Sequence, residues 1–166
     1  MKVFLNICGQ RMQQTHKATL QHYRWTKGVN ESMKIEVTTI KQTVTVPASP
    51  EQVYEAFTDA KKHTEFTGIK ATGKPKAGSK FTAWDGYIFG KYLELEEGKS
   101  IVQGWMTTDW PKDYPPSKLE LTFKKTPRGT EITLIQTDAP KSQAEELAEG
   151  WTEFYWTPLK EYFKKQ

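Results

Sequence analysis

The stretch "EGWTEFYWTPLKEYF", residues 149–163, decides the fold that this sequence predicts. Its apolar residues recur at steps of three and four, which places them on one face of a helix. A capping-box pattern at Ser142 and Glu145 predicts where the helix begins. From Gln143 to Phe163 it would be about 30 Å long, at about 1.5 Å per residue, so it can lie across a whole sheet. The predicted apolar face consists of Leu147, Trp151, Phe154, Tyr155, Pro158, Leu159, Tyr162 and Phe163.

Pro158 interrupts this helix. It has no amide proton to donate to the carbonyl of Phe154, and its ring crowds the preceding turn, a penalty of about 3 kcal/mol unless the helix bends. We therefore expect a kink between Phe154 and Thr157.

The residues before the helix predict a sheet for it to cover. The run "EVTTIKQTVTV", residues 36–46, alternates and is rich in β-branched residues, which is typical of a strand with Ile40, Gln42, Val44 and Val46 on one face. Further strands are predicted at residues 79–84, 87–97, 99–108, 117–123 and 131–137.

Local signals mark the turns and helices between these strands. Asp85-Gly86 predicts a hairpin, because both central residues of a type I′ turn need positive φ. Ser49 and Gln52 form a capping box around Pro50, which predicts the start of a helix. A second short helix is expected from residue 60 to 66.

The order of elements is one strand, two helices, about five strands and one long helix. It predicts an α+β fold in which a curved antiparallel sheet of about six strands packs on the C-terminal helix. A length of 166 residues suits one domain. We assign residues 34–166 to this domain and residues 1–33 to an N-terminal extension, either disordered or a targeting segment.

The extension differs from the rest of the chain in charge. Residues 1–30 hold five Lys or Arg and no Asp or Glu, so the other 19 basic residues and all 20 acidic ones lie in the remainder. A basic, acid-poor segment is typical of a mitochondrial transit peptide, although serine is scarce here. The alternative is a bland extension with Met33 as a second start site. We expect a cytoplasmic protein, or a mitochondrial one if the extension is a transit peptide.

The composition argues against several classes of protein. The nearly neutral body lacks the basic field of a nucleic-acid-binding protein. No apolar run approaches the roughly 18 residues of a membrane-spanning helix, so we expect no membrane partner. Cys8 is the only cysteine, which rules out an intrachain disulfide and a thiolate metal cluster and fits a reducing compartment.

Catalytic chemistry has few candidates in this sequence. The histidines are His16, His22 and His63, and we place His63 on a solvated helix face because its neighbours are charged. No glycine-rich phosphate loop follows a strand, and no residue pair has zinc-ligand spacing. We therefore expect no enzyme, no metal and no cofactor.

Spaced residues between 49 and 163 together carry a family resemblance. They are Ser49-Pro50-Glu51, Phe57, Gly78, Lys80-Phe81, Asp85-Gly86, Ile88, Gly90, Ile101-Val102, Trp105, Trp110-Pro111, Leu121-Thr122-Phe123, Gly129-Thr130-Glu131, Gly150-Trp151, Tyr155, Lys160 and Phe163. In this order they resemble the C-terminal domain of the activator of heat-shock protein 90 ATPase, over about residues 36–163. That family belongs to the SRPBCC superfamily, which has the START-like helix-grip fold.

The resemblance implies a co-chaperone-like module that binds heat-shock protein 90 and modulates its ATPase. The full activator has a separate N-terminal domain that supplies much of its contact with the chaperone, and residues 1–33 are too short to replace it. The wider superfamily implies the alternative, a carrier of a small apolar ligand held between sheet and helix.

The apolar face of the last helix has two interpretations. It covers the sheet as ordinary core, or it lines a cavity for an apolar ligand together with facing residues. The cavity candidates are Phe66, Trp84, Trp105, Trp151 and Tyr155.

The loop "MTTDWPKDYPPSKL", residues 106–119, offers the best candidates for contact with a partner protein. Its rings and charges, at Trp110, Asp109, Lys112 and Tyr114, form a mixture common at interface anchors. We expect Trp110→Ala to leave folding nearly intact while weakening the contact. The alternative is a rigid connector with Trp110 tucked against the body.

Overall fold

The structure, a computed structural model, describes residues 35–166, so the predictions for residues 1–33 fall outside the described residues. These residues form one compact unit. Within this range no helix is long and apolar enough to cross a membrane.

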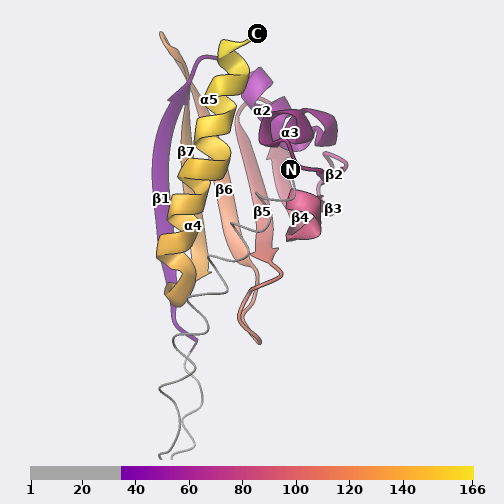
Figure 1. Cartoon of the computed structure of the whole chain (residues 1–166), viewed down its shortest axis with the longest axis vertical. Helices are drawn as coiled ribbons and strands as arrows, with labels where there is room; N and C mark the ends of the chain where they lie inside the picture. Colours follow the sequence, from indigo (N-terminus) through magenta and orange to yellow (C-terminus); the bar gives the residue numbers. More distant parts are fainter. Residues whose placement is uncertain (1–34) are drawn as a thin grey trace, which may run out of the picture. The chain divides into compact units, whose positions relative to one another are not determined.

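The described chain folds into a seven-stranded antiparallel sheet with helices lying against one face, which we call the inner face (Figure 1). The strands are β1 (Val37–Val46), β2 (Thr72–Gly73), β3 (Lys80–Ala83), β4 (Ile88–Glu96), β5 (Ser100–Thr107), β6 (Ser117–Thr126) and β7 (Gly129–Pro140). Their order across the sheet is β1-β7-β6-β5-β4-β3-β2, so the first strand pairs with the last. The predicted α+β fold is confirmed, and β2, a strand of only two residues, raises the strand number from about six to seven.

Two short helices follow β1, as the sequence predicts: α2 (Pro50–Thr58) and α3 (Ala60–Thr67). The Ser49 hydroxyl accepts from the Gln52 amide at 3.2 Å, and the Gln52 side chain accepts from the Ser49 amide at 2.9 Å. This capping box fixes the start of α2. Gly68, with φ of 73°, ends α3 in the left-handed conformation that glycine adopts without a steric penalty.

The C-terminal helix runs through α4 (Ala144–Trp151), a π-helical turn (Thr152–Trp156) and α5 (Thr157–Lys164). The predicted capping box at Ser142 is wrong. Ser142 already lies inside a 3₁₀ turn (Lys141–Gln143), and α4 begins without a side-chain cap. A residue inside a helical turn is not placed ahead of the first free amides, so its hydroxyl cannot cap them.

The irregularity expected before Pro158 is present, but it is a π turn and not a sharp kink. The helix continues through it as one rod (Figure 1). Both the amide and the hydroxyl of Thr157 donate to the Thr152 carbonyl, the hydroxyl at 3.0 Å. The wider turn holds one extra residue, and Trp156, absent from the predicted apolar face, is buried.

The hairpin between β3 and β4 has the predicted turn. Asp85 and Gly86 have φ of 57° and 89°, and the Tyr87 amide donates to the Trp84 carbonyl at 3.1 Å. Trp84 also has positive φ, 55°, which is uncommon for a bulky residue.

The core lies between the inner face of the sheet and the C-terminal helix. Its fully buried valine, isoleucine and leucine side chains come from four strands, from α2 and from α5. They are Val46, Val53, Ile101, Leu119, Leu121, Ile132, Leu134 and Leu159, each at most 1% exposed.

Candidate functional site

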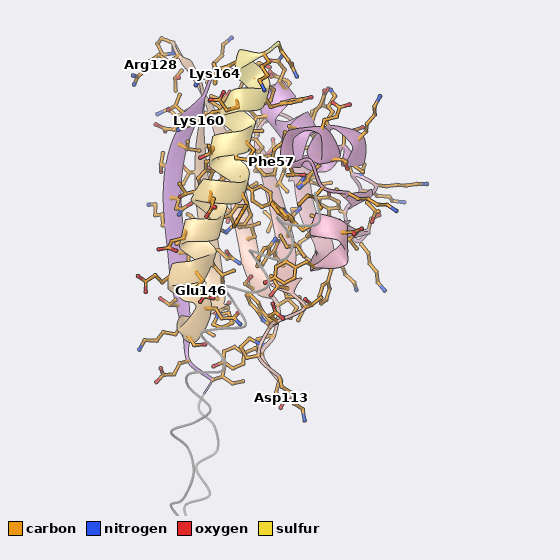
Figure 2. All side chains as sticks on the ribbon, in the orientation of Figure 1. Phe57, Asp113, Arg128, Glu146, Lys160 and Lys164 are labelled. Carbon is orange, nitrogen blue, oxygen red and sulfur yellow. The ribbon has the colours of Figure 1, made fainter. Side chains whose placement is uncertain are left out.

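The aromatic rings on the C-terminal helix pack against rings from the sheet and from α2. Trp151 lies 4.5 Å from Tyr155 and 5.8 Å from Trp105, measured between ring centroids. Tyr155 in turn stacks on Phe57 at 6.1 Å. Figure 2 labels Phe57, whose ring points from α2 into the interior toward the C-terminal helix. These rings fill the space between the two layers.

The indoles of Trp151 and Trp156 are hydrogen-bonded within the protein, whereas the buried Nε1 of Trp84 has no partner among residues 35–166. The Trp151 indole donates to the Gln136 side-chain oxygen at 3.0 Å, and the Gln136 amide donates to the Ser117 hydroxyl at 2.9 Å. Ser117 donates to the Trp105 carbonyl at 2.8 Å. Trp156 donates in the same way to Gln42 at 2.7 Å. Indoles already bonded to side-chain amides offer no polar handle to a ligand.

The pocket among these core rings has a volume of about 20 Å³. Of the five cavity candidates, Trp105, Trp151 and Tyr155 line it, whereas Phe66 and Trp84 do not. Phe66 packs on Phe57 at 5.8 Å, and Trp84 packs on Phe154 at 5.2 Å. A void of this size holds about one water molecule. Ligand sites for drug-sized molecules need roughly 300 Å³ or more, so these residues form core.

Two buried tyrosines stay protonated in this environment. Burial raises the pKa of Tyr92 to about 12 and raises the pKa of Tyr155 further. Neither phenol can act as a base near neutral pH.

His63 lies in the core, and its expected place on a solvated face is wrong. It is 8% exposed, and its ring packs among Phe57, Phe66 and Tyr155. Its Nδ1 lies 3.4 Å from the Phe57 carbonyl oxygen, while Nε2 has no partner among residues 35–166. Burial lowers the pKa of His63 to about 4, against a smaller opposite effect of the Phe57 carbonyl. The sequence misleads here because Lys61, Lys62 and Glu65 lie beside His63 in α3 and suggest a solvated face.

The loop between β5 and β6 is folded back onto the body. Trp110 is only 8% exposed, its indole donates to the Pro115 carbonyl at 3.0 Å, and its ring lies 5.9 Å from Trp105. The expectation that Trp110 is an exposed anchor is therefore wrong. An apolar ring of this size gains more from contact with Trp105 than from exposure to water.

The other loop candidates occupy different environments. Asp109 and Lys112 are exposed, and the Asp109 carbonyl accepts from Gln143 at 2.8 Å. Tyr114 is half-buried, and its hydroxyl accepts from the Glu36 amide at 3.1 Å. Figure 2 shows Asp113 at the tip of this loop, pointing away from the rest of the protein. The loop thus presents charged groups, and its rings serve the fold.

A groove on the opposite face of the sheet was missed by the sequence analysis. Trp105 contacts the C-terminal helix, so its neighbours Gly104 and Met106 point to the outer face. There they form part of an open groove of about 710 Å³. Phe89 and Leu93, 36% and 47% exposed, line it as well. Apolar residues at outward positions of β4 and β5 were the available signal, because a solvated face normally carries polar residues there.

Between residues 35 and 166, no three His, Cys, Asp or Glu side chains lie close enough together to hold an ion.

The sequence matches the family described as "Activator of Hsp90 ATPase homolog 1-like protein" over residues 47–164. It is 30% identical over 131 residues to the "Activator of 90 kDa heat shock protein ATPase homolog 1" of Homo sapiens. It is 31% identical over 114 residues to the "Activator of 90 kDa heat shock protein ATPase homolog" of Dictyostelium discoideum. These matches cover 78% and 68% of this chain but 38% and 30% of the relatives. The chain therefore spans well under half the length of these relatives.

Solved structures with the same fold include an HSP90 activator from Plasmodium falciparum, with a TM-score of 0.67 and 25% identity. That match covers 77% of this chain and 96% of the other. A protein from Mesorhizobium loti has a TM-score of 0.66 at 21% identity, covering 78% and 98% of the two chains. The second likeness concerns the fold alone.

Proposed function

The chain belongs to the family of Activator of Hsp90 ATPase homolog 1-like proteins, and from this we propose that it binds a heat-shock protein 90 chaperone and modulates its ATPase. The observation that carries the proposal is the match over residues 47–164, together with 30% identity to the human protein named as such an activator. The proposed role is binding and not catalysis.

The geometry of the interior supports a partner outside the fold. The indoles of Trp151 and Trp156 bond to Gln136 and Gln42, and the pocket of about 20 Å³ among the core rings leaves no room for a carried ligand. A protein of this family with a filled interior acts through its surface. The small pocket therefore favours the chaperone over the apolar ligand of the alternative function.

The loop between β5 and β6 supplies contact candidates for this role. Asp109 and Lys112 are the exposed charges among the residues that we proposed there. Rim charges act mainly on association rate and specificity. A cytoplasmic location is part of the proposal, because a single cysteine suits a reducing compartment, and fractionation of the source cells tests it.

The test uses the full chain and the chaperone from the same cells. We expect saturable binding and a change in the ATP turnover of the chaperone. Lys112→Glu should weaken binding, whereas Lys61→Glu, the same charge change on an exposed residue of α3, should not. The absence of binding at tens of micromolar would remove the proposal.

A further inference from the structure

The groove on the outer face of the sheet has a row of lysines across it. In the strand register, Lys80 lies opposite Lys91, Lys91 opposite Gly104, and Gly104 opposite Lys118. The row thus crosses β3, β4, β5 and β6. Gly104, which has no side chain, lies between Lys91 and Lys118. Strands are about 4.8 Å apart, so Lys91 and Lys118 flank a gap of about 10 Å, wide enough for an extended peptide.

The walls and floor beside this row are apolar. Phe89 pairs with Met106 across β4 and β5, and Leu93 and Pro116 also line the groove. Phe89 and Leu93 are among the most exposed large apolar side chains of the described residues. Apolar side chains that gather in one open groove mark an interaction surface more often than scattered ones do.

The charges in the groove have one sign. Of the described side chains that line it, three are basic and none is acidic. Lys118 has a carboxylate nearby, since its Nζ lies 3.7 Å from an oxygen of Glu120. Lys80 and Lys91 form no ion pair within residues 35–166. Like charges directly opposite each other on neighbouring strands destabilise a sheet, and an anion between them would remove that cost.

We propose that this groove binds an extended segment of a partner protein in which acidic residues alternate with apolar ones. Alternate side chains of an extended segment point to opposite sides. When such a segment lies in the groove on its edge, its acidic side chains can reach the lysines and its apolar side chains can reach the apolar walls. The carboxylates meet Lys80 and Lys91, and an apolar side chain enters the gap over Gly104. This inference is independent of the proposed function, because it concerns the chemistry of the segment and not the identity of the partner.

Charge distinguishes this occupant from two others. Residues 1–30 of the chain are basic and contain no acidic residue, so the lysine row would repel them. A second copy that presents the same face would set the lysine rows against each other. An acidic partner is the occupant that complements the row.

Gly104 allows the gap to be filled without disturbing the fold. A Cβ placed on Gly104 would have Pro116 Cβ as its nearest neighbour at 3.9 Å, an ordinary contact. A Cβ on Gly90 would instead lie 1.8 Å from the Gly104 carbonyl oxygen, so only the former site can be enlarged. Valine also suits a strand better than glycine does. Gly104→Val should therefore keep or raise the melting temperature while it blocks the gap.

The experiment measures fluorescence anisotropy of a labelled eight-residue peptide of alternating leucine and aspartate, titrated with the full chain. We expect saturable binding that weakens by about tenfold in Lys91→Glu and in Gly104→Val, and that weakens in 0.5 M NaCl because salt screens the lysines. Lys41→Glu is the matched control. It makes the same charge change at an exposed position at the other end of the sheet and should alter binding less than about twofold.

Several outcomes would overturn the proposal. One is no saturable binding by the wild-type chain, and another is equal binding of a peptide with lysine in place of aspartate. Equal weakening by Lys41→Glu and Lys91→Glu would mean that only net charge matters. If Gly104→Val fails to fold, Lys80→Glu and Lys91→Glu still decide the result. A dimer in sedimentation that Gly104→Val abolishes would assign the groove to a second copy instead.

Discussion

At the scale of single residues, His63 makes the stability of the fold depend on pH. Its pKa of about 4 in the folded protein lies below its ordinary value of 6.5, so the unfolded chain takes up a proton first. Stability is therefore complete above about pH 6.5 and is lost as the pH falls from there toward about 4. We expect the free energy of unfolding to fall by about 2 kcal/mol between about pH 7.5 and pH 5 through this residue.

Urea unfolding at the two pH values measures this effect. His63→Phe is the matched control, because it keeps a ring among Phe57, Phe66 and Tyr155 that cannot titrate. The loss at low pH should be smaller in the variant by about 2 kcal/mol. An equal loss in both proteins would show that His63 is not the group responsible.

Trp110 belongs to the fold, and its truncation should show this. Because the ring is buried against Trp105 and its indole is bonded to Pro115, we expect Trp110→Ala to lower the free energy of unfolding by about 3 kcal/mol. Tyr114→Phe, in the same loop, removes only a hydroxyl and should cost about 1 kcal/mol or less. Chemical denaturation followed by circular dichroism compares the two variants. A cost for Trp110→Ala as small as that for Tyr114→Phe would mean that the ring contributes nothing to stability.

The neighbouring residues did not predict the burial of His63, and they left the burial of Trp110 as one of two alternatives. Charged side chains surround both His63 and Trp110 in the sequence, and they favour exposure. His63 is buried by contact with Tyr155, far along the chain, whereas Trp110 is buried because its own loop folds back, with Trp105 and Pro115 each five residues away. The loop prolines signalled stiffness but not the direction in which the loop folds.

At the scale of elements, two similar capping patterns should respond differently to the same change. Ser49→Ala removes the cap of α2 and should lower the free energy of unfolding by about 1 kcal/mol. Ser142→Ala should leave it within about 0.5 kcal/mol of the wild type, because Ser142 caps no helix. Thermal unfolding of both variants tests this, and a comparable loss in each would contradict the described start of α4.

The elements were predicted where the signal is local. The cap at Ser49 and the Asp85-Gly86 turn each depend on a few adjacent residues, and the structure confirms both. The start of α4 and the π turn depend on how the helix meets β1. Lys141 bonds back to Glu36 and Trp156 bonds to Gln42, which the sequence does not reveal.

At the scale of the whole molecule, the filled interior predicts no response to an apolar ligand. A ligand at 100 times its dissociation constant stabilises a folded protein by about 2.7 kcal/mol, a shift that is easily seen in a melting curve. We expect a neutral sterol, titrated up to its solubility limit, to leave the melting temperature unchanged. A rise that Trp151→Phe alters would show that the core opens to admit it.

The sequence predicted the residues of the inner face of the sheet but not the groove on its outer face. Alternation within each strand and the helix period predicted the inner layer, and with it Trp151, Tyr155 and Leu159 in the core. The outer groove depends on register, since Lys80 and Lys91 become neighbours only when β3 and β4 pair. Register is set by the whole sheet and was not predictable strand by strand.

The pairing of β1 with β7 has a consequence for synthesis on the ribosome. Among the described strands β1 pairs with β7 alone, so it has no partner until β7, which begins at Gly129, leaves the exit tunnel. Late pairing of distant segments slows folding and leaves a strand edge open to aggregation. Nascent chains arrested before Gly129 should therefore be digested by protease, whereas chains released at Gln166 should resist it.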